Sequence, residues 1–328
     1  MPGNNWDRVP IDAQSVDAPL SQSAIFLVVT VAADRSALAK VCSVLGELDD
    51  LVKNVGFRDL GGRLSCIAGI GGGLWDRLDA GKRPAELKPF APIKGAVHSA
   101  PSTPGDLLFH IRAERPDMCF EFERILLDRL GAGVTVLDEV TGFRYFDARD
   151  LLGFVDGTAN PTGVDLPASA LVGDEDGYFA GGSYVVVQKY LHDMQAWARI
   201  PTPEQEAIIG RTKIDNIEID DDDAPRKSHK SLATIEDADG NEYDILRDNM
   251  PFGRPGQNEF GTYFIGYSRY LWVIEKMLQR MYIGDPPGAY DRLLDVSTPQ
   301  TGTTFFAPTR PMLQTLVQRA PEKSSTAP

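Results

Sequence analysis

The sequence of 328 residues contains only three cysteines, Cys42, Cys66 and Cys119, and they lie far apart. They form no Cys-x-x-Cys-His motif and no zinc-binding spacing. An odd number of dispersed cysteines is typical of buried free thiols in a reducing compartment. We therefore expect a cytoplasmic protein without disulfide bonds.

Long apolar segments are also missing. The most continuous one, residues 24–33, has about half of the roughly 20 residues that a membrane-spanning helix needs. The N-terminal residues carry acidic side chains and prolines but not the apolar segment of a signal peptide. We expect neither a membrane span nor secretion.

Positive charge is the third shortage. Lys and Arg number 33 against 47 acidic residues, which gives a formal net charge of −14. This excess repels phosphate backbones and anionic lipid surfaces, so the charge argues against nucleic acids and membranes as partners. Hydrophobic residues make up 42% of the chain, enough for a sizeable core, and the length favours two domains.

Hydrophobic periodicity predicts strands and helices in alternation. Strands are predicted over residues 24–31, 51–57, 64–70, 107–111, 134–140, 183–190 and 260–267. Helices are predicted after Asp34, over residues 120–130, around Met194 and Trp197, and over residues 270–281. Several links are too short for parallel crossovers, so we expect an α+β fold with antiparallel sheets and helices packed on them.

Similar strand-then-helix units begin both halves, which suggests a duplicated domain. The predicted organisation is a flexible arm over residues 1–22, a first domain over residues 23–145, a second domain over residues 146–315, and a disordered tail over residues 316–328.

Of the four histidines, His98, His110 and His192 are expected to be structural. His229 lies in a polar segment and is followed by two short segments around Asp239-Gly240, a strong hairpin turn. A two-residue turn there pairs Leu232 with Arg247 and Lys230 with Asn249. It brings His229 and the segment 247–249 together at the open end, on opposite faces of one flat cofactor.

A second informative segment is Gly153-Phe-Val-Asp-Gly-Thr-Ala-Asn-Pro161. Its turn-forming residues place one carboxylate, that of Asp156, beside apolar neighbours. Asp156 is either a turn aspartate that accepts backbone hydrogen bonds or a partly desolvated acid/base group.

These segments together resemble the dye-decolourising peroxidases, most closely the shorter B-type bacterial branch. Gly153-Phe-Val-Asp156-Gly157 matches the family's G-x-x-D-G motif, and residues 247–253 (RDNMPFG) match a second segment. His229, about seventy residues after the motif, stands where the family has its proximal haem ligand. The resemblance covers most of the chain, and the three matches at these spacings are specific together.

The resemblance implies two ferredoxin-like domains, with haem b (iron protoporphyrin IX) held in the C-terminal one. It implies that His229 ligates the iron and that Asp291 is its hydrogen-bond partner. Asp156, Arg247 and Asn249 then line the distal pocket. Arg211 lies near a haem propionate, and Phe264 contacts the macrocycle.

The implied activity is the reduction of hydrogen peroxide through a ferryl intermediate, with oxidation of dyes, phenolic compounds or Mn(II). The permanent charge of Arg247 suits the stabilisation of separating oxygens, and Asp156 suits proton transfer. We expect Arg247 to contribute slightly more. Glu218 and Glu242 are candidates for helping to bind manganese, and Tyr190 and Trp197 for surface radical sites.

Three other functions stay open. They are a haem-binding or iron-releasing protein on the same fold, a chlorite-degrading enzyme, and a non-catalytic assembly protein. The chlorite-degrading enzymes lack the aspartate of G-x-x-D-G, which favours the peroxidase. The resemblance also implies a homo-oligomer. B-type relatives are often cargo of encapsulin shells, but residues 318–328 lack the apolar docking sequence that this would require.

Overall fold

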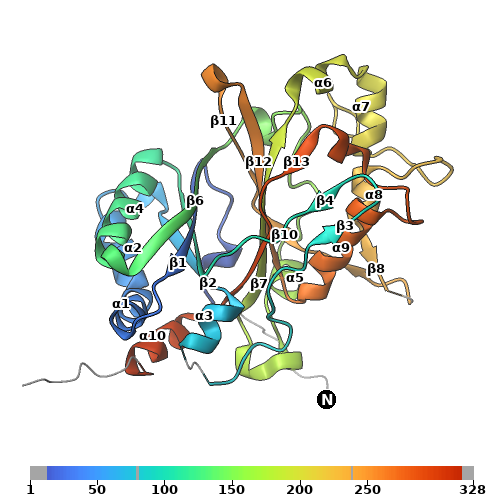
Figure 1. The fold of residues 1–328 in the computed structure, drawn as a ribbon. Helices are drawn as coiled ribbons and strands as arrows, with labels where there is room; N and C mark the ends of the chain where they lie inside the picture. Colours follow the sequence, from blue (N-terminus) through green and yellow to red (C-terminus); the bar gives the residue numbers. More distant parts are fainter. Residues whose placement is uncertain (1–12, 79–80, 238, 320–328) are drawn as a thin grey trace, which may run out of the picture.

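Two sets of antiparallel strands form the centre of the molecule. A computed structural model of the chain describes residues 13–78, 81–237 and 239–319 (Figure 1). The first set runs in the order β2-β5-β1-β6, and the second in the order β10-β12-β7-β14. Their bounds are β1 (Ser23–Val31), β2 (Ser65–Ile70), β5 (Leu107–Ala113), β6 (Val134–Phe143), β7 (Ser183–His192), β10 (Leu246–Arg247), β12 (Glu259–Ser268) and β14 (Thr303–Ala307).

Both sets have the same permutation. In each, the first strand in sequence lies between the third and the fourth, and the second lies outside the third. This is the ferredoxin-like order, so the prediction of two ferredoxin-like domains with antiparallel sheets is confirmed. Phe306 of β14 pairs with Ile70 of β2, which joins the two sets into one ten-stranded sheet that also includes β11 (Met250–Arg254) and β13 (Ser297–Pro299).

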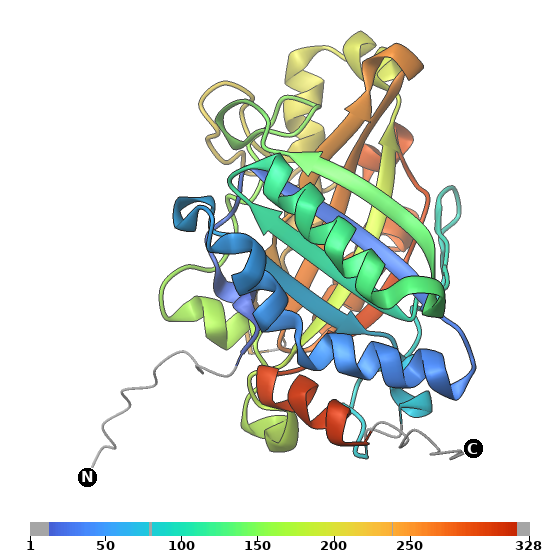
Figure 2. The same cartoon turned by 90° about the vertical axis from the view of Figure 1, so that its left-hand side faces the viewer.

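Helices cover the outer faces of this sheet. On the first domain these are α1 (Arg35–Gly46), α2 (Leu48–Gly56) and α4 (Pro116–Leu130), which lie in front of the strands in Figure 2. On the second domain they are α8 (His229–Ala233) and α9 (Leu271–Ile283). The remaining helices and strands are α3 (Gly72–Arg77), β3 (Ile93–Lys94), β4 (Ser99–Ala100), α5 (Asp165–Ala170), α6 (Met194–Arg199), α7 (Thr202–Ile209), β8 (Ile235–Glu236), β9 (Glu242–Tyr243) and α10 (Arg310–Arg319).

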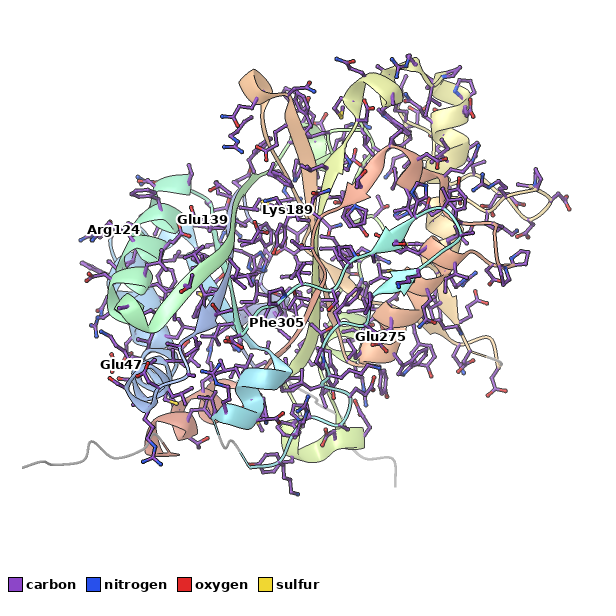
Figure 3. The ribbon with its side chains drawn as sticks, viewed as in Figure 1. Glu47, Arg124, Glu139, Lys189, Glu275 and Phe305 are labelled. Carbon is purple, nitrogen blue, oxygen red and sulfur yellow. The ribbon has the colours of Figure 1, made fainter. Side chains whose placement is uncertain are left out.

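The alternation of side chains along the strands creates two cores. On β1, Leu27 and Val29 belong to the core beneath the helices, whereas Phe26 and Val28 belong to a core between the two domains. Phe305 lies in that central core (Figure 3).

Polar pairs also cross between the domains. Lys189 of β7 contacts Asp138 of β6 at 2.9 Å (Figure 3). Arg112 of β5 contacts the fully buried carboxylate of Asp248 at 2.8 Å. The first domain therefore packs against the second domain, which holds the site described below, through these ion pairs and the central core.

Most predicted elements are confirmed, including the helix after Asp34, whose side chain accepts a hydrogen bond from the backbone N–H of Ala37 at 2.9 Å. The strand predicted over residues 51–57 is wrong, because this segment belongs to α2. Leu48, Leu51 and Val55 are buried at helical spacing there, and tertiary packing outweighs the local preference for a strand.

The predicted arm and tail also differ from the structure. Residues 1–12 and 320–328 lie outside the described residues. The second part of the arm is packed, since the Gln14 side chain bonds the backbone of Ala68 twice and that of Pro308 once. Helix α10 continues the fold to Arg319, with Leu316 buried.

The three cysteines are free and buried. In the described parts of the chain, no helix has the length and apolar character that a membrane crossing requires.

Candidate cofactor-binding site

Two adjoining cavities open in the second domain. The inner cavity has a volume of about 910 Å³ and the outer cavity one of about 710 Å³. Both volumes include the solvent-filled space at the opening. Both have walls formed only by residues between 150 and 297. The cavities share six wall residues, namely Val155, Asp156, Ile209, His229, Ala233 and Arg247.

The two cavities differ in chemistry. The inner walls are mainly apolar and include Leu152, Phe154, Phe264, Met277 and Leu278. The walls of the outer cavity include four charged groups that the inner cavity lacks, namely Arg211, Lys230, Glu242 and Asp244. Together they form one space with an apolar interior and a charged mouth.

His229 is the first residue of α8. The helix begins there because the Ser228 side chain accepts a hydrogen bond from the backbone N–H of Ser231. The Nδ1 of His229 lies 2.6 Å from the Oδ2 of Asp291, whose side chain is fully buried. A carboxylate only accepts hydrogen bonds, so Nδ1 carries the proton and Nε2 is left with its lone pair.

The carboxylate of Asp291 is itself fixed. Its Oδ1 accepts a hydrogen bond from the backbone N–H of Leu293 at 2.9 Å, at the start of the short 3-10 helix Arg292–Asp295. Burial lowers the pKa of His229, but the charge and hydrogen bond of Asp291 outweigh burial, and the pKa lies above its usual value. The Asp291–His229 pair therefore holds one imidazole in one orientation and makes it electron-rich.

Asp156 lies in the turn-rich loop that the sequence singled out. Gly153 and Gly157 have φ values of +94° and +75°, which favour glycine at both ends of the short segment that carries Asp156. The amide of Asn249 lies 3.4 Å from the Oδ1 of Asp156, and the Oδ1 of Asn249 accepts a hydrogen bond from the backbone N–H of Ile265. Asn249 thus links the Asp156 loop to β12.

Arg247 lines the same cavity, and its guanidinium makes few contacts with the described residues. Its Nη2 has a weak contact of 3.5 Å with the sulfur of Met277. Among the described residues, no carboxylate lies within ion-pair distance of its guanidinium. Burial lowers the pKa of Arg247, and Asp156 and Asp244 counteract this, so a charged donor group faces the cavity.

The reason why His229 and Arg247 meet differs from the prediction. Only Ile235 and Glu236 pair with β9, because α8 occupies residues 229–233. Arg247 pairs instead with Gly266 of β12. The predicted register of Leu232 with Arg247 is wrong, although its conclusion that His229 and Arg247 share one space is confirmed. Ala238, in the predicted turn region, lies outside the described residues.

The structure brings the candidate residues of the sequence close together. Asp156, Arg247, Asn249, His229 and Phe264 line the inner cavity. Arg211 lines the outer cavity, where its guanidinium bonds Asn216 and lies 3.4 Å from Glu218. Asp291 stands behind His229.

Two residues important to the site were missed. The side chain of Asn160 holds the backbone of Arg247. Its Nδ2 donates to the carbonyl of Arg247 at 2.7 Å, and its Oδ1 accepts from the N–H of Arg247 at 2.9 Å. Asp150 is a second acid on the inner wall, and burial raises its pKa to about 7. Asn160 lies within the recognised motif, but its contact spans 87 positions of sequence, which local patterns do not reveal.

The suggestion of surface radicals on Tyr190 or Trp197 is wrong, because these side chains are 8% and 3% exposed. No group of three or more His, Cys, Asp or Glu side chains in the described part of the chain could hold a metal ion. Glu218 is already paired with Lys230 at 2.5 Å, while Glu242 is exposed at the outer cavity.

The residues present fit a haem. The Nε2 of one imidazole supplies a ligand of the kind that haem iron accepts, and a buried carboxylate supports it. The apolar inner walls suit a macrocycle, and Arg211 and Lys230 at the mouth suit its carboxylates.

Comparisons with known proteins agree with this geometry. Models of the N-terminal and C-terminal parts of Dyp-type peroxidases match residues 13–144 and 147–312. A dye-decolorizing peroxidase of Mycolicibacterium paratuberculosis is 56% identical over 92% of this chain and 84% of its own length. One of Rhodococcus erythropolis is 51% identical over 98% and 94%. The structure of DyPB from Rhodococcus jostii RHA1 is similar with a TM-score of 0.90 and 58% identity, over 92% of this chain and 97% of that one.

Proposed function

Because the chain belongs to the Dyp-type peroxidase family, we propose that it is a haem b peroxidase in which His229, Asp156 and Arg247 carry the chemistry. It reduces hydrogen peroxide and oxidises dyes and phenolic compounds. The observation that carries the assignment of residues is that the imidazole of His229, bonded to Asp291, and the guanidinium of Arg247 line one cavity.

His229 would hold the haem iron through its Nε2. Asp291 holds the proton of Nδ1 and prevents the ring from turning. When bound, haem supplies the iron at which peroxide reacts and stores the oxidising equivalents. A charged partner on the far nitrogen of the ligand strengthens electron donation toward that iron.

Asp156 and Arg247, which line the same cavity, would act on the peroxide. The Oδ1 of Asp156 is engaged by Asn249, which leaves Oδ2 to take the proton from one peroxide oxygen and return it to the other. Arg247 stabilises the negative charge that develops as the oxygens separate, with donors already in place. Asn249 is a positioning residue, because it holds the carboxylate of Asp156.

The test is rapid mixing of haem-loaded protein with peroxide, followed at the Soret band. Arg247→Ala is expected to slow the first spectral change by about 100-fold or more, as the loss of a preorganised charge-stabilising donor does. Asp156→Ala should slow it less. Arg254→Ala, at an exposed arginine of β11, is the matched control. An Arg247→Ala protein with the parental rate contradicts the proposal.

Mn(II) is a further proposed reductant. A structure of a DypB variant is described as a complex with manganese. In this chain Glu242 and Asp244 lie at the outer cavity, but Glu218 is neutralised by Lys230 and Arg211. We propose weak Mn(II) oxidation that Glu242→Gln reduces, which steady-state assays with Mn(II) and peroxide measure.

We also propose a homo-oligomer in the cytoplasm. Exposed apolar side chains along β6 (Val136, Leu137 and Phe143) support self-association, and three buried free thiols support a reducing compartment. Light scattering of the parent and Leu137→Asp measures the oligomer. A similar structure is that of an encapsulated DyP-type peroxidase from Mycobacterium smegmatis. Co-expression with an encapsulin shell tests whether this chain shares that property.

The iron-releasing alternative has less support. Proteins named deferrochelatase, from Yersinia species, are 24% identical over 63% of this chain, far below the identity of the dye-decolorizing peroxidases. Haem-loaded protein that releases iron without consuming peroxide would favour this alternative.

A further inference from the structure

Three aromatic side chains form a cluster beside the outer cavity. Tyr243 of β9 lines that cavity. The centre of its ring lies 4.9 Å from that of Trp272 and 6.1 Å from that of Tyr270, and the latter two are 6.2 Å apart. All three side chains are half-buried, so they contact both the protein and the solvent. We call Tyr243, Tyr270 and Trp272 the mouth cluster.

We propose that the mouth cluster is an oxidation site for aromatic donors too large for the cavity, with a preference for cationic ones. The proposal rests on the proposed peroxidase function, because peroxide reduction inside the cavity supplies the oxidising equivalent. Tyr243 is the link, since its ring belongs both to the cavity wall and to the surface cluster.

Tyr243 has a base that can take its proton. Its hydroxyl donates to the Oδ2 of Asp237 at 3.4 Å, and burial of the phenol together with this carboxylate raises the pKa of Tyr243. One electron leaves the ring toward the cavity while the O–H bond breaks and the proton passes to Asp237. A donor at the surface then returns one electron, and Asp237 returns the proton. Tyr243 is restored, and the donor is oxidised by one electron.

Two other tyrosines whose hydroxyls have a polar partner lack this combination. Tyr190 lines the inner cavity, but its hydroxyl donates to the amide oxygen of Gln188, a poor proton acceptor, and it is buried. Tyr267 contacts the imidazole of His110 at 2.8 Å, but both side chains are fully buried in the core between the domains. Tyr243 alone of the three joins a cavity wall, a carboxylate and the solvent.

The charges around the cluster favour cations. Residues 231–246 contain no Lys or Arg but five acidic residues, which are Glu236, Asp237, Asp239, Glu242 and Asp244. Two of the nearby cations are paired with other carboxylates, namely Arg269 with Glu175 and Lys230 with Glu218. Lys276 donates to the backbone carbonyl of Glu236 at 3.3 Å, so the five carboxylates outnumber the nearby cations that are not paired elsewhere. A cationic aromatic donor gains from these carboxylates at low salt and from contact with the half-buried aromatic rings.

The electron route is tested by paramagnetic resonance of haem-loaded protein frozen after peroxide is added without a donor. We expect a tyrosyl radical signal that Tyr243→Phe removes and Tyr178→Phe keeps, since Tyr178 is an exposed tyrosine next to Lys82. With a cationic phenothiazine dye, kcat should fall several-fold in Tyr243→Phe and Trp272→Phe. In Trp272→Phe, whose side chain is not part of the wall of either cavity, the rate of the first reaction with peroxide should stay at the parental value.

These readouts separate the inference from the proposed function. If Tyr243→Phe reacts normally with peroxide and shows the same radical signal and the same dye turnover as Tyr178→Phe, the proposed oxidation site is wrong. The proposed function is not affected by that result. A parent protein that does not react with peroxide refutes the proposed function instead.

The charge preference is tested with the double variant Glu236→Gln/Asp239→Asn, at two exposed positions of the hairpin. Its KM for the cationic dye should rise about threefold at low salt, as the loss of two surface charges predicts, while its KM for an anionic anthraquinone dye falls. At about 0.5 M NaCl, where the screening length is roughly 4 Å, the difference should disappear. Equal changes for both dyes contradict the preference.

Discussion

Asn160 offers a test of how the distal pocket is built. Its side chain makes two hydrogen bonds to the backbone of Arg247, of 2.7 and 2.9 Å. Asn160 is not among the residues that line the inner or the outer cavity. The turn that carries it is tight, because Asn160 donates its backbone N–H to the carbonyl of Gly157. Asn160→Ala removes both bonds and leaves two backbone groups of Arg247 without these partners.

The magnitude follows from those two bonds. A part-buried backbone group that loses its hydrogen-bond partner costs about 1–2 kcal/mol, so the two groups together should cost about 2–4 kcal/mol. For a chain of this length that corresponds to a fall in Tm of roughly 3–6 °C. A shift of Arg247 by about 1 Å should also slow the reaction with peroxide by up to about 100-fold.

The assays are thermal unfolding and rapid mixing of the haem-loaded variant with peroxide. Asn160→Asp is an intermediate case, because its carboxylate still accepts from the N–H of Arg247 but cannot donate to the carbonyl. Val164→Ala, at a highly exposed position of the same loop, is the control. If Asn160→Ala reacts with peroxide at the parental rate, the reasoning that Asn160 positions Arg247 is wrong.

Two further predictions concern buried charges. Asp248→Asn leaves the charge of Arg112 without its counter-ion in a fully buried pair, which should cost about 3–5 kcal/mol; an unchanged Tm in thermal unfolding would contradict this. Burial raises the pKa of Asp150 to about 7, above its unfolded value of about 4, so its contribution to stability is present below pH 4 and is lost as the pH rises to about 7. The Tm of Asp150→Asn minus the Tm of the parent should therefore rise between about pH 4 and 7. A Tm difference that does not change with pH would refute the raised pKa of Asp150.

Local patterns predicted most strands and the capped helix after Asp34, because alternation and capping are properties of neighbouring residues. They failed at residues 51–57, where Leu51 and Val55, together with Leu48, are buried at helical spacing in a helix that packs against α4 and β2. They also failed just after His229, because a serine cap starts a helix where the hairpin pairing of Lys230 and Leu232 was predicted.

The sequence predicted those site residues whose chemistry only one or two residue types can supply. His229, Asp156 and Arg247 belong to recognisable segments, and the structure places them on one cavity. Asn160 and Asp150 were not found, because their importance comes from contacts and burial that only the fold creates. The mouth cluster joins β9 to the start of α9, which lie far apart in sequence.

The most direct measurement is the absorption spectrum of haem-reconstituted His229→Ala, with and without added imidazole. We predict that the variant loses the parental spectrum and that imidazole restores it, while His98→Ala, in the loop between β3 and β4, keeps it. A parental spectrum in His229→Ala without imidazole would contradict the assignment of His229 as the haem ligand.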